Sequence, residues 1–372
     1  MNASTLRLSR AARLRGALPC LAIMGLLAVG VAALPGAAHA QYKAASNAIL
    51  KIGNKLPTLS GTDQFGKPRT FDNLKGPNGL VILFFRSADW CPYCKGQLLS
   101  LQRAAARFKA KGLGLAGVSY DSVDILKFFT DKYSISYPLL SDPNSETIER
   151  FGVLNKEATG FRKGMAFPGF VYANATGRIQ ETFFEEDYHT RFTGGSMLLK
   201  IFPELASSAP RDVPAPHIQL KLAQSDDVAS PGNRVTLIAD LSLPPDLHVY
   251  APGVDGYRPI ALQLDATPRA TPEPAVYPKP KILLLPAIHE KVPVYEGNFR
   301  ITQDVTIAFD DDFAKLLAAG PPSGSLLKLD GLLLYQACDS HVCYPPEKVP
   351  VSWPVTVLPP NTVRAPDEIQ HK

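Results

Sequence analysis

The strongest constraint on the fold of this chain is a change of pattern at about residue 205. Between Gly79 and Ile201, short apolar runs such as GLVILFF alternate with segments whose apolar residues recur at helical spacing. From Pro210 onward that spacing disappears, and 24 of the 34 prolines separate short runs of alternating polar and apolar residues. Because 372 residues suffice for two domains, we predict an α/β domain followed by an all-β domain.

Domain boundaries follow from the same change in composition. We predict a leader over residues 1–40, an α/β domain over residues 47–205, a linker over residues 206–216, an all-β domain over residues 217–360 and a tail over residues 361–372. Within the all-β domain, only the stretch DDFAKLLAAG is expected to form a helical turn.

Three local features can be predicted from turn and capping signals. The helical spacing after the motif CPYC runs to Gly112, which is expected to end that helix. The stretch YANATGRI predicts a hairpin whose turn holds Asn174 and Gly177. In the stretch SDPNSETIERFGV, Asp142 is expected to cap a helix that has Pro143 in its first turn.

The first forty residues have the features of a secretory signal. Four arginines without an acidic residue precede an uncharged run, and the small residues AHA end at Ala40. We expect cleavage after Ala40 and a periplasmic protein; the alternative is a retained anchor over residues 17–38. The net charge of +5 includes the four leader arginines, so the rest is nearly neutral and gives no reason to expect nucleic acid as a partner.

Four of the five cysteines form two close pairs. Cys20 lies in the leader, whereas Cys91 and Cys94 are separated by two residues and Cys338 and Cys343 by four. An exported protein with an even set of close cysteines is expected to oxidise them within each pair.

The first pair lies between a predicted strand and a predicted helix. There, unpaired backbone N–H groups and the helix dipole favour a thiolate at Cys91, so we expect it to attack a partner disulfide. Cys94, one turn later and more buried, would resolve the mixed disulfide. Pro92 suits the first helical turn. A structural disulfide and half of a zinc site are the alternatives.

The motif CPYC and the downstream stretch FPGFVYANATGRI resemble the AhpC/TSA, redoxin-like branch of the thioredoxin superfamily, over about residues 56–202. The resemblance implies a thioredoxin fold with a redox-active CxxC, and we expect no cofactor beyond the cysteines. In that family a cis proline faces the CxxC and guides the incoming chain, and Pro168 matches it. Trp90, Pro92, Phe167 and Pro168 are therefore the expected substrate-binding residues.

Two features depart from the family patterns. Peroxiredoxins carry a proline and a Thr or Ser seven and three residues before the peroxidatic cysteine, where this chain has Phe84 and Ala88, with Ser87 adjacent. Thioredoxins place a buried acid six residues before the first cysteine, where this chain has phenylalanine. Asp89 and Lys95 are the remaining candidates to accept the proton of the resolving thiol.

The second pair is poorly placed for a structural staple. A bridge that closes so short a loop contributes only about 2 kcal/mol in the chain-entropy model, and short exposed bridges are more often labile. The stretch YQACDSHVCYPP resembles the N-terminal periplasmic domain of the thiol:disulfide interchange protein DsbD, over about residues 217–358. The resemblance implies an immunoglobulin-like sandwich, a reversible Cys338–Cys343 disulfide that passes electrons to periplasmic partners, and a cap over it at residues 290–295.

Three functions are open at this point. The leading one is a periplasmic thiol-disulfide oxidoreductase whose two pairs exchange electrons with each other or with client thiol proteins, supplied by a separate membrane protein. The second is a thiol peroxidase in which peroxide oxidises Cys91 and the fused domain supplies reducing equivalents. The third is a metal-handling protein, although Met165 and Met197 do not lie near the cysteines in sequence. His341 is expected to be solvated, and FRKG, residues 161–164, to be either a solvated loop or a means of steering acidic partners.

Overall fold

A computed structural model describes residues 48–184, 187–205, 210–285 and 290–372. The predicted leader, its cleavage after Ala40, the alternative anchor over residues 17–38 and Cys20 all lie outside these residues. Within the described ranges, no helix has the length and apolar character needed to cross a membrane.

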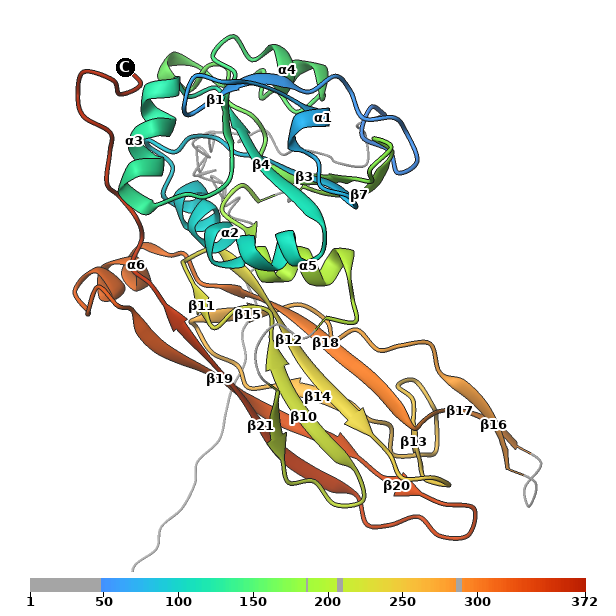
Figure 1. Cartoon of the computed structure of the whole chain (residues 1–372). Coiled ribbons are helices and arrows are strands. Elements are labelled where there is room, and N and C mark those ends of the chain that lie inside the picture. The colour runs from blue at the N-terminus through green and yellow to red at the C-terminus, as the bar shows by residue number, and fades with distance from the viewer. Residues whose placement is uncertain (1–47, 185–186, 206–209, 286–289) are drawn as a thin grey trace, which may run out of the picture. The chain divides into compact units, whose positions relative to one another are not determined.

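A seven-stranded sheet forms the centre of the first half of the chain, in the order β2-β1-β5-β4-β3-β6-β7 (Figure 1). β3 (Gly79–Phe84) lies parallel to β4 (Leu113–Ser119) and antiparallel to β6 (Gly169–Ala173). Every residue of β3 is buried, which explains why its sequence is continuously apolar. The remaining strands are β1 (Ser60–Asp63), β2 (Pro68–Thr70), β5 (Leu139–Ser141) and β7 (Ile179–Phe184).

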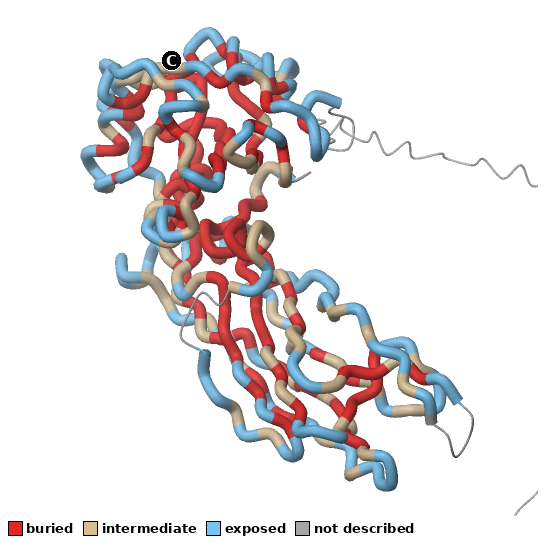
Figure 2. The backbone as a smooth tube through the Cα atoms, turned by 45° about the vertical axis from the view of Figure 1, so that its right-hand side comes forward, coloured by how far each residue is buried: buried red, intermediate tan, exposed pale blue. Residues whose placement is uncertain are grey.

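Helices cover both faces of this sheet. They are α1 (Phe71–Leu74), α2 (Pro92–Ala110), α3 (Val123–Tyr133), α4 (Glu146–Arg150) and α5 (Gly194–Ile201). Val81 and Leu83 pack with residues of α2, α3 and α5, whereas Leu80 and Ile82 pack with residues of α1 and α4. Buried strands therefore lie inside exposed loops (Figure 2), and the predicted α/β, thioredoxin-like domain is confirmed.

Two of the three local predictions are confirmed. α2 ends before Gly112, whose φ of 66° lies in the left-handed region that a helix C-terminus favours. The β6–β7 hairpin turns at Asn174 and Gly177, and the Asn174 side-chain oxygen accepts the N–H of Thr176 at 3.1 Å. Both turns therefore follow the local signals in the sequence.

The predicted start of α4 is wrong. The helix begins at Glu146, three residues after Pro143, and Ser145 precedes it with a φ of 58°. The N–H of Ser145 donates to the carbonyl of Asp142 at 2.8 Å, which closes a turn before the helix. The Asp142 carboxylate still accepts the N–H of Ile148 at 2.8 Å, so it supports the helix from outside its first turn.

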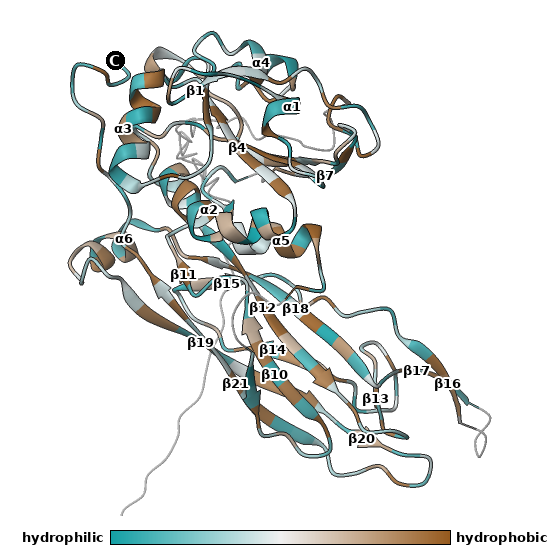
Figure 3. Cartoon of the chain, in the orientation of Figure 1, coloured by the Kyte–Doolittle hydropathy of each residue, from teal (hydrophilic) through white to brown (hydrophobic). Residues whose placement is uncertain are grey.

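The second half of the described chain is β-rich, as predicted, and contains several sheets. β12 (Asn233–Ser242) pairs with β10 (Gln219–Gln224) and β18 (Asn298–Ile307), while β19 (Ser325–Tyr335) pairs with β21 (Glu347–Val357). Hydrophobic and hydrophilic residues alternate along these strands (Figure 3). The others are β9 (Arg211–Val213), β11 (Val228–Ala229), β13 (His248–Tyr250), β14 (Ala261–Leu264), β15 (Ala270–Pro272), β16 (Lys281–Leu285), β17 (Glu290–Glu296) and β20 (Ala337–Cys338).

One apolar core joins β12 to β19 and β21. It contains Leu237 of β12 and Trp353 of β21, which is fully buried and donates its indole N–H to the carbonyl of Ile238 at 3.2 Å. α6 (Asp311–Ala318) forms where a helical turn was expected, and Asp310 caps it by accepting a backbone N–H. The second half is thus built around a core of its own.

Segments predicted as linker and tail make defined contacts. Within residues 206–216, β9 pairs with β10. β8 (Arg191–Phe192), which follows the α/β sheet in the chain, pairs parallel with Asn233 and Arg234 of β12. Part of the tail, residues 361–372, contacts the loop that precedes Cys91, as described below.

Candidate functional site

The first cysteine pair lies at the start of α2, just after β3, as predicted. Cys91 is the N-cap residue of α2, and its Sγ accepts the N–H of Cys94 at 3.3 Å. The Sγ of Cys94 accepts the backbone N–H of Arg86 at 3.4 Å. The two cysteines form a disulfide, with Cα atoms 5.3 Å apart. Each sulfur therefore faces a backbone N–H, which would stabilise a thiolate once the disulfide is reduced.

Both cysteines are buried in this state. Cys91 is 1% exposed and Cys94 is 0% exposed, so burial does not separate the expected attacking sulfur from the resolving one. Because an incoming disulfide must reach a sulfur along its S–S axis, neighbouring side chains have to move before Cys91 can react with a substrate.

The expected substrate-binding residues come from two segments of the chain. Trp90 and Pro92 flank Cys91, and both are half-buried. Phe167 and Pro168 immediately precede β6, whose first residue pairs with the last residue of β3. The end of β3 leads directly into the loop that carries Cys91, so all four residues belong to the same edge of the sheet.

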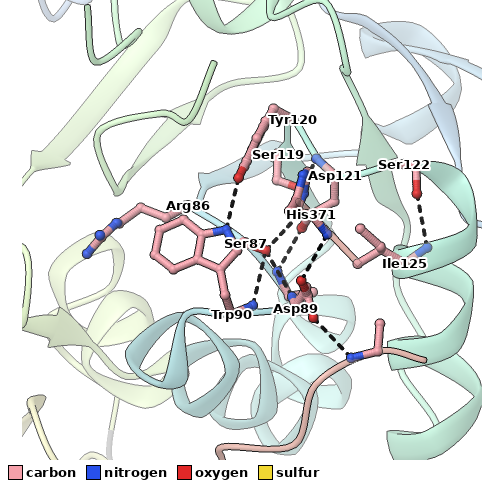
Figure 4. A network of polar contacts seen from close by, with 12 residues as sticks. Arg86, Ser87, Asp89, Trp90, Ser119, Tyr120, Asp121, Ser122, Ile125 and His371 are labelled. Carbon is pink, nitrogen blue, oxygen red and sulfur yellow. Dashed lines mark hydrogen bonds and ion pairs between the residues drawn. The ribbon is translucent and has the colours of Figure 1, made fainter. Parts of the chain in front are cut away.

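A buried carboxylate holds the loop before Cys91 (Figure 4). Asp121 Oδ1 accepts the hydroxyl of Ser87 at 2.7 Å, and Oδ2 accepts the N–H of Ala88 at 2.7 Å and the hydroxyl of Ser119 at 2.9 Å. Nε2 of His371, in the C-terminal tail, lies 2.7 Å from Asp121 Oδ1. The geometry of the loop before Cys91 therefore depends on Asp121, just after β4, and on His371 in the C-terminal tail.

A second buried carboxylate binds the tail directly. Arg364 donates to both oxygens of Asp89 at 2.7 Å, and the N–H of Ala365 donates at 3.0 Å. Burial alone would raise the pKa of Asp89, but the hydrogen bonds from Arg364 and Ala365 outweigh it and the pKa is lowered. Asp89 therefore stays ionised and is poorly suited to accept the proton of Cys94.

Lys95 is the other candidate proton acceptor. Its side chain is fully buried, and Nζ donates to the carbonyls of Asp89 at 2.9 Å and of Val363 at 2.6 Å. Burial lowers the pKa of Lys95 to about 8. A neutral amine still has two N–H donors for the two carbonyls, so proton loss breaks neither hydrogen bond.

We expect the burial of Lys95 to make stability depend on pH. The folded chain holds this proton less tightly than the unfolded chain, whose lysine pKa is about 10.4, so stability rises between about pH 8 and 10.4. Relative to Lys95→Met, the free energy of unfolding of the wild type should rise by about 3 kcal/mol across that window. Urea unfolding of both proteins at several pH values measures the difference; a constant difference would contradict the lowered pKa.

The second cysteine pair also forms a disulfide, with Cα atoms 4.0 Å apart. Cys338 is fully buried in β20, where it pairs with His248, whereas Cys343 is exposed. The hydroxyl of Tyr250 lies 3.9 Å from the Sγ of Cys343. His341 is exposed, as expected. Exposure therefore favours Cys343 as the sulfur that meets a partner.

The predicted cap at residues 290–295 lies in β17, which pairs with β13. Two valines of β17 pack with Cys338 and Tyr250 in one apolar cluster, and the ring of Tyr257 lies 4.2 Å from that of Tyr250. These side chains bury one sulfur of the pair. Cys91 and Cys94 belong to one apolar cluster of buried residues, and Cys338 belongs to another.

Sequence reasoning missed three residues of the site. Asp121 was not predicted as a site residue, although it follows β4, which lies parallel to β3, so its neighbourhood was predictable. Arg364 and His371 carried no signal, because they lie 275 and 250 residues after Asp89 and Asp121, the residues that they contact.

Comparisons with known proteins identify both halves. Residues 52–182 match the AhpC/TSA family, and residues 219–352 match the family described as thiol:disulfide interchange protein DsbD, N-terminal. The 1-Cys peroxiredoxin PER1 of Hordeum vulgare is 31% identical over 121 residues, which are 30% of this chain and 55% of that protein. The chain thus spans about half the length of this relative.

Other relatives include both peroxiredoxins and disulfide oxidoreductases. The peroxiredoxin bcp of Coxiella burnetii is 30% identical over 105 residues, 28% of this chain and 68% of that protein. The thiol-disulfide oxidoreductase ResA of Bacillus thuringiensis is 27% identical over 106 residues, 28% of this chain and 60% of that protein. Among solved structures, the peroxidoxin BcpB of Mycobacterium tuberculosis is 23% identical, with a TM-score of 0.34 over 37% of this chain and 88% of that one.

Proposed function

The chain belongs to the AhpC/TSA family, and on this premise we propose that it is a thiol-disulfide oxidoreductase that works through Cys91 and Cys94. The Cys91 thiolate attacks one sulfur of a substrate disulfide, which forms a mixed disulfide and releases one substrate thiolate. The Cys94 thiolate then attacks Cys91 Sγ and releases the second. Two electrons pass to the substrate, whose two thiolates take up protons, and no cofactor beyond the cysteines is proposed.

The observation that carries this proposal is the position of Cys91 as the N-cap of α2, with Cys94 Sγ against a backbone N–H. Two thiolates stabilised in this way, one helical turn apart, are what sequential exchange requires. Trp90, Pro92, Phe167 and Pro168 are proposed to contact the substrate around the reacting sulfur; the last two lie at the start of β6.

A thiol peroxidase is the second candidate, favoured by the peroxiredoxin relatives. Phe84 and Ala88 stand where that chemistry needs a proline and a hydroxyl. Ser87 is no substitute, because its hydroxyl donates to Asp121 at 2.7 Å and its oxygen accepts the N–H of Asp89 at 2.9 Å. Because the Ser87 hydroxyl is already engaged in these hydrogen bonds, we favour a disulfide over peroxide as the oxidant of Cys91.

For the second half we propose an immunoglobulin-like sandwich over residues 217–360 whose Cys338–Cys343 pair relays electrons. The exposure of Cys343 supports this role, as do the shared core of β12 and β21 and the match to the DsbD N-terminal family. We further propose that the chain works in the periplasm, as the predicted leader suggests, with thiol proteins and a separate membrane electron donor as partners. Because both cysteine pairs belong to one chain, each has a high effective concentration at the other, provided that the linker lets them meet.

Rapid mixing tests the choice of oxidant. We expect the reduced chain to react faster with an oxidised protein disulfide than with hydrogen peroxide, in a step that Cys91→Ser abolishes. Tryptophan fluorescence reports it, because Trp90 adjoins Cys91 and the other tryptophan, Trp353, is fully buried in the second half. Faster Cys91-dependent oxidation by peroxide would instead establish the peroxidase.

A further inference from the structure

Arg86, five residues before Cys91, is a buried cation that forms no ion pair with any residue that the structure describes. The residue is 7% exposed, and its buried Nε has no hydrogen-bond partner among the described residues. Burial lowers its pKa to about 10; Tyr188, Tyr120 and Tyr93 act against this shift, and the charge of Arg162 adds to it. Within the described part of the chain, no carboxylate forms an ion pair with this guanidinium. A desolvated charge left unpaired is costly, so its retention calls for an explanation.

Two aromatic rings fix the guanidinium in place. Its centre lies 4.7 Å from the centroid of the Trp90 ring and 4.5 Å from that of Tyr188. Figure 4 shows the Arg86 side chain running past the indole and away from the Asp89–Asp121 network. Cation–π contacts on two sides orient the planar group without neutralising it, and they leave its N–H donors for a ligand.

A second cation shares the same indole. The guanidinium centre of Arg162 lies 5.2 Å from the centroid of the Trp90 ring and 5.3 Å from that of Phe161. Phe161 in turn meets Trp90 edge to face, with ring centroids 5.7 Å apart. Arg162 is exposed and belongs to the stretch FRKG. Two like charges against one ring repel each other, which an anion between or beside them would relieve.

We propose that Arg86, with Arg162 and the rings of Trp90 and Tyr188, forms a binding subsite for a carboxylate on the disulfide substrate, close to its reacting sulfur. A carboxylate is the planar anion that a fixed guanidinium binds through two parallel hydrogen bonds. Trp90 immediately precedes Cys91 in the chain, so a carboxylate bound against its indole would belong to the part of the substrate next to the disulfide that Cys91 attacks. The inference deepens the proposed function and rests on it.

Three small disulfides of similar size test the subsite: 3,3′-dithiodipropionate, which is anionic, bis(2-hydroxyethyl) disulfide, which is neutral, and cystamine, which is cationic. The readout is the ratio of second-order rate constants for the anionic and neutral compounds. A hydrogen bond to a charged group contributes about 1.5–3 kcal/mol, so Arg86→Gln should lower this ratio by about tenfold or more. Arg178→Gln is the matched control, because Arg178 is exposed in the β6–β7 turn. It should leave the ratio unchanged.

A second readout does not need catalysis. Propionate added to the oxidised chain should change Trp90 fluorescence in a saturable way, in the wild type and in Arg178→Gln. In Arg86→Lys, which keeps the charge but loses the fork of donors, the apparent affinity should fall. Equal ratios and equal propionate affinities in wild type and Arg86 variants would overturn the subsite. If no disulfide reacts through Cys91 while propionate still binds beside Trp90, the proposed function fails and the anion site stands.

Comparison with the neutral and cationic disulfides also distinguishes specific binding of a carboxylate from a general attraction of anions to positive charge. A specific subsite predicts that the anionic preference survives 0.5 M salt in large part, because a desolvated pair is screened little. A preference that disappears with salt, and that Arg178→Gln lowers as much as Arg86→Gln, would reduce the effect to long-range steering and overturn the proposal.

Discussion

Replacing Cys94 with serine is expected to stop the reaction after its first step and to leave the chain covalently joined to its substrate. Cys91 keeps its position as N-cap of α2, so it can still attack a disulfide. The mixed disulfide then lacks the neighbouring thiolate that resolves it. Intramolecular attack by a well-placed group reaches effective molarities of about 10⁵ M or more, so turnover should fall by at least about 10³-fold.

Mass spectrometry of Cys94→Ser mixed with a peptide disulfide would detect the adduct on Cys91. Cys91→Ser should form no adduct on the first pair, and the double variant Cys338→Ser/Cys343→Ser should still form the Cys91–Cys94 disulfide after one turnover. Unchanged turnover in Cys94→Ser would show instead that the partner thiol comes from another molecule, and that Cys94 is not the resolving residue.

The parts of the fold that sequence could predict are those set by local patterns. The continuous apolar run of β3, the helical spacing of α2 and the turn at Asn174 and Gly177 each depend on residues close together in the chain. The start of α4 was missed for a local reason as well, since Asp142 has two roles available and the turn at Ser145 uses its carbonyl first. Two good capping signals in succession do not say which one the helix takes.

The site was only half predictable for a different reason. CPYC and its flanking residues predict redox chemistry because the two reacting cysteines are close together in the sequence. The groups that hold them are not: Asp121 comes from the end of β4, and Arg364 and His371 come from the tail. Arg86 could not be predicted as a binding residue from the sequence. The reason to propose it is that it lacks a counter-ion among its described neighbours, and only the three-dimensional packing shows this.

Replacing Arg364 with methionine is expected to destabilise the chain by about 2–4 kcal/mol. The side chain of Asp89 is 0% exposed, and loss of its partner leaves a buried carboxylate with fewer hydrogen bonds. The estimate lies toward the low end for buried pairs because Arg364 is 39% exposed. Lys127→Met is the matched control: its ion pair with Asp131 is 2.6 Å long but exposed on both sides, so its loss should cost less than about 0.5 kcal/mol.

The pH dependence of the stability loss in Arg364→Met tests whether the Asp89 carboxylate causes that loss. The folded-state pKa of Asp89 is lowered, so its contribution is fully present above the unfolded value of about 3.9 and is lost as pH falls through the folded value. The difference in free energy of unfolding between wild type and Arg364→Met should therefore be greatest at neutral pH and shrink toward pH 4, as Asp89 takes up a proton in the variant. Asp89→Asn/Arg364→Met should recover most of the loss, because no buried charge remains. A loss that is independent of pH and persists in the double variant would mean that Arg364 acts through packing of the tail, and that the charge of Asp89 plays no part.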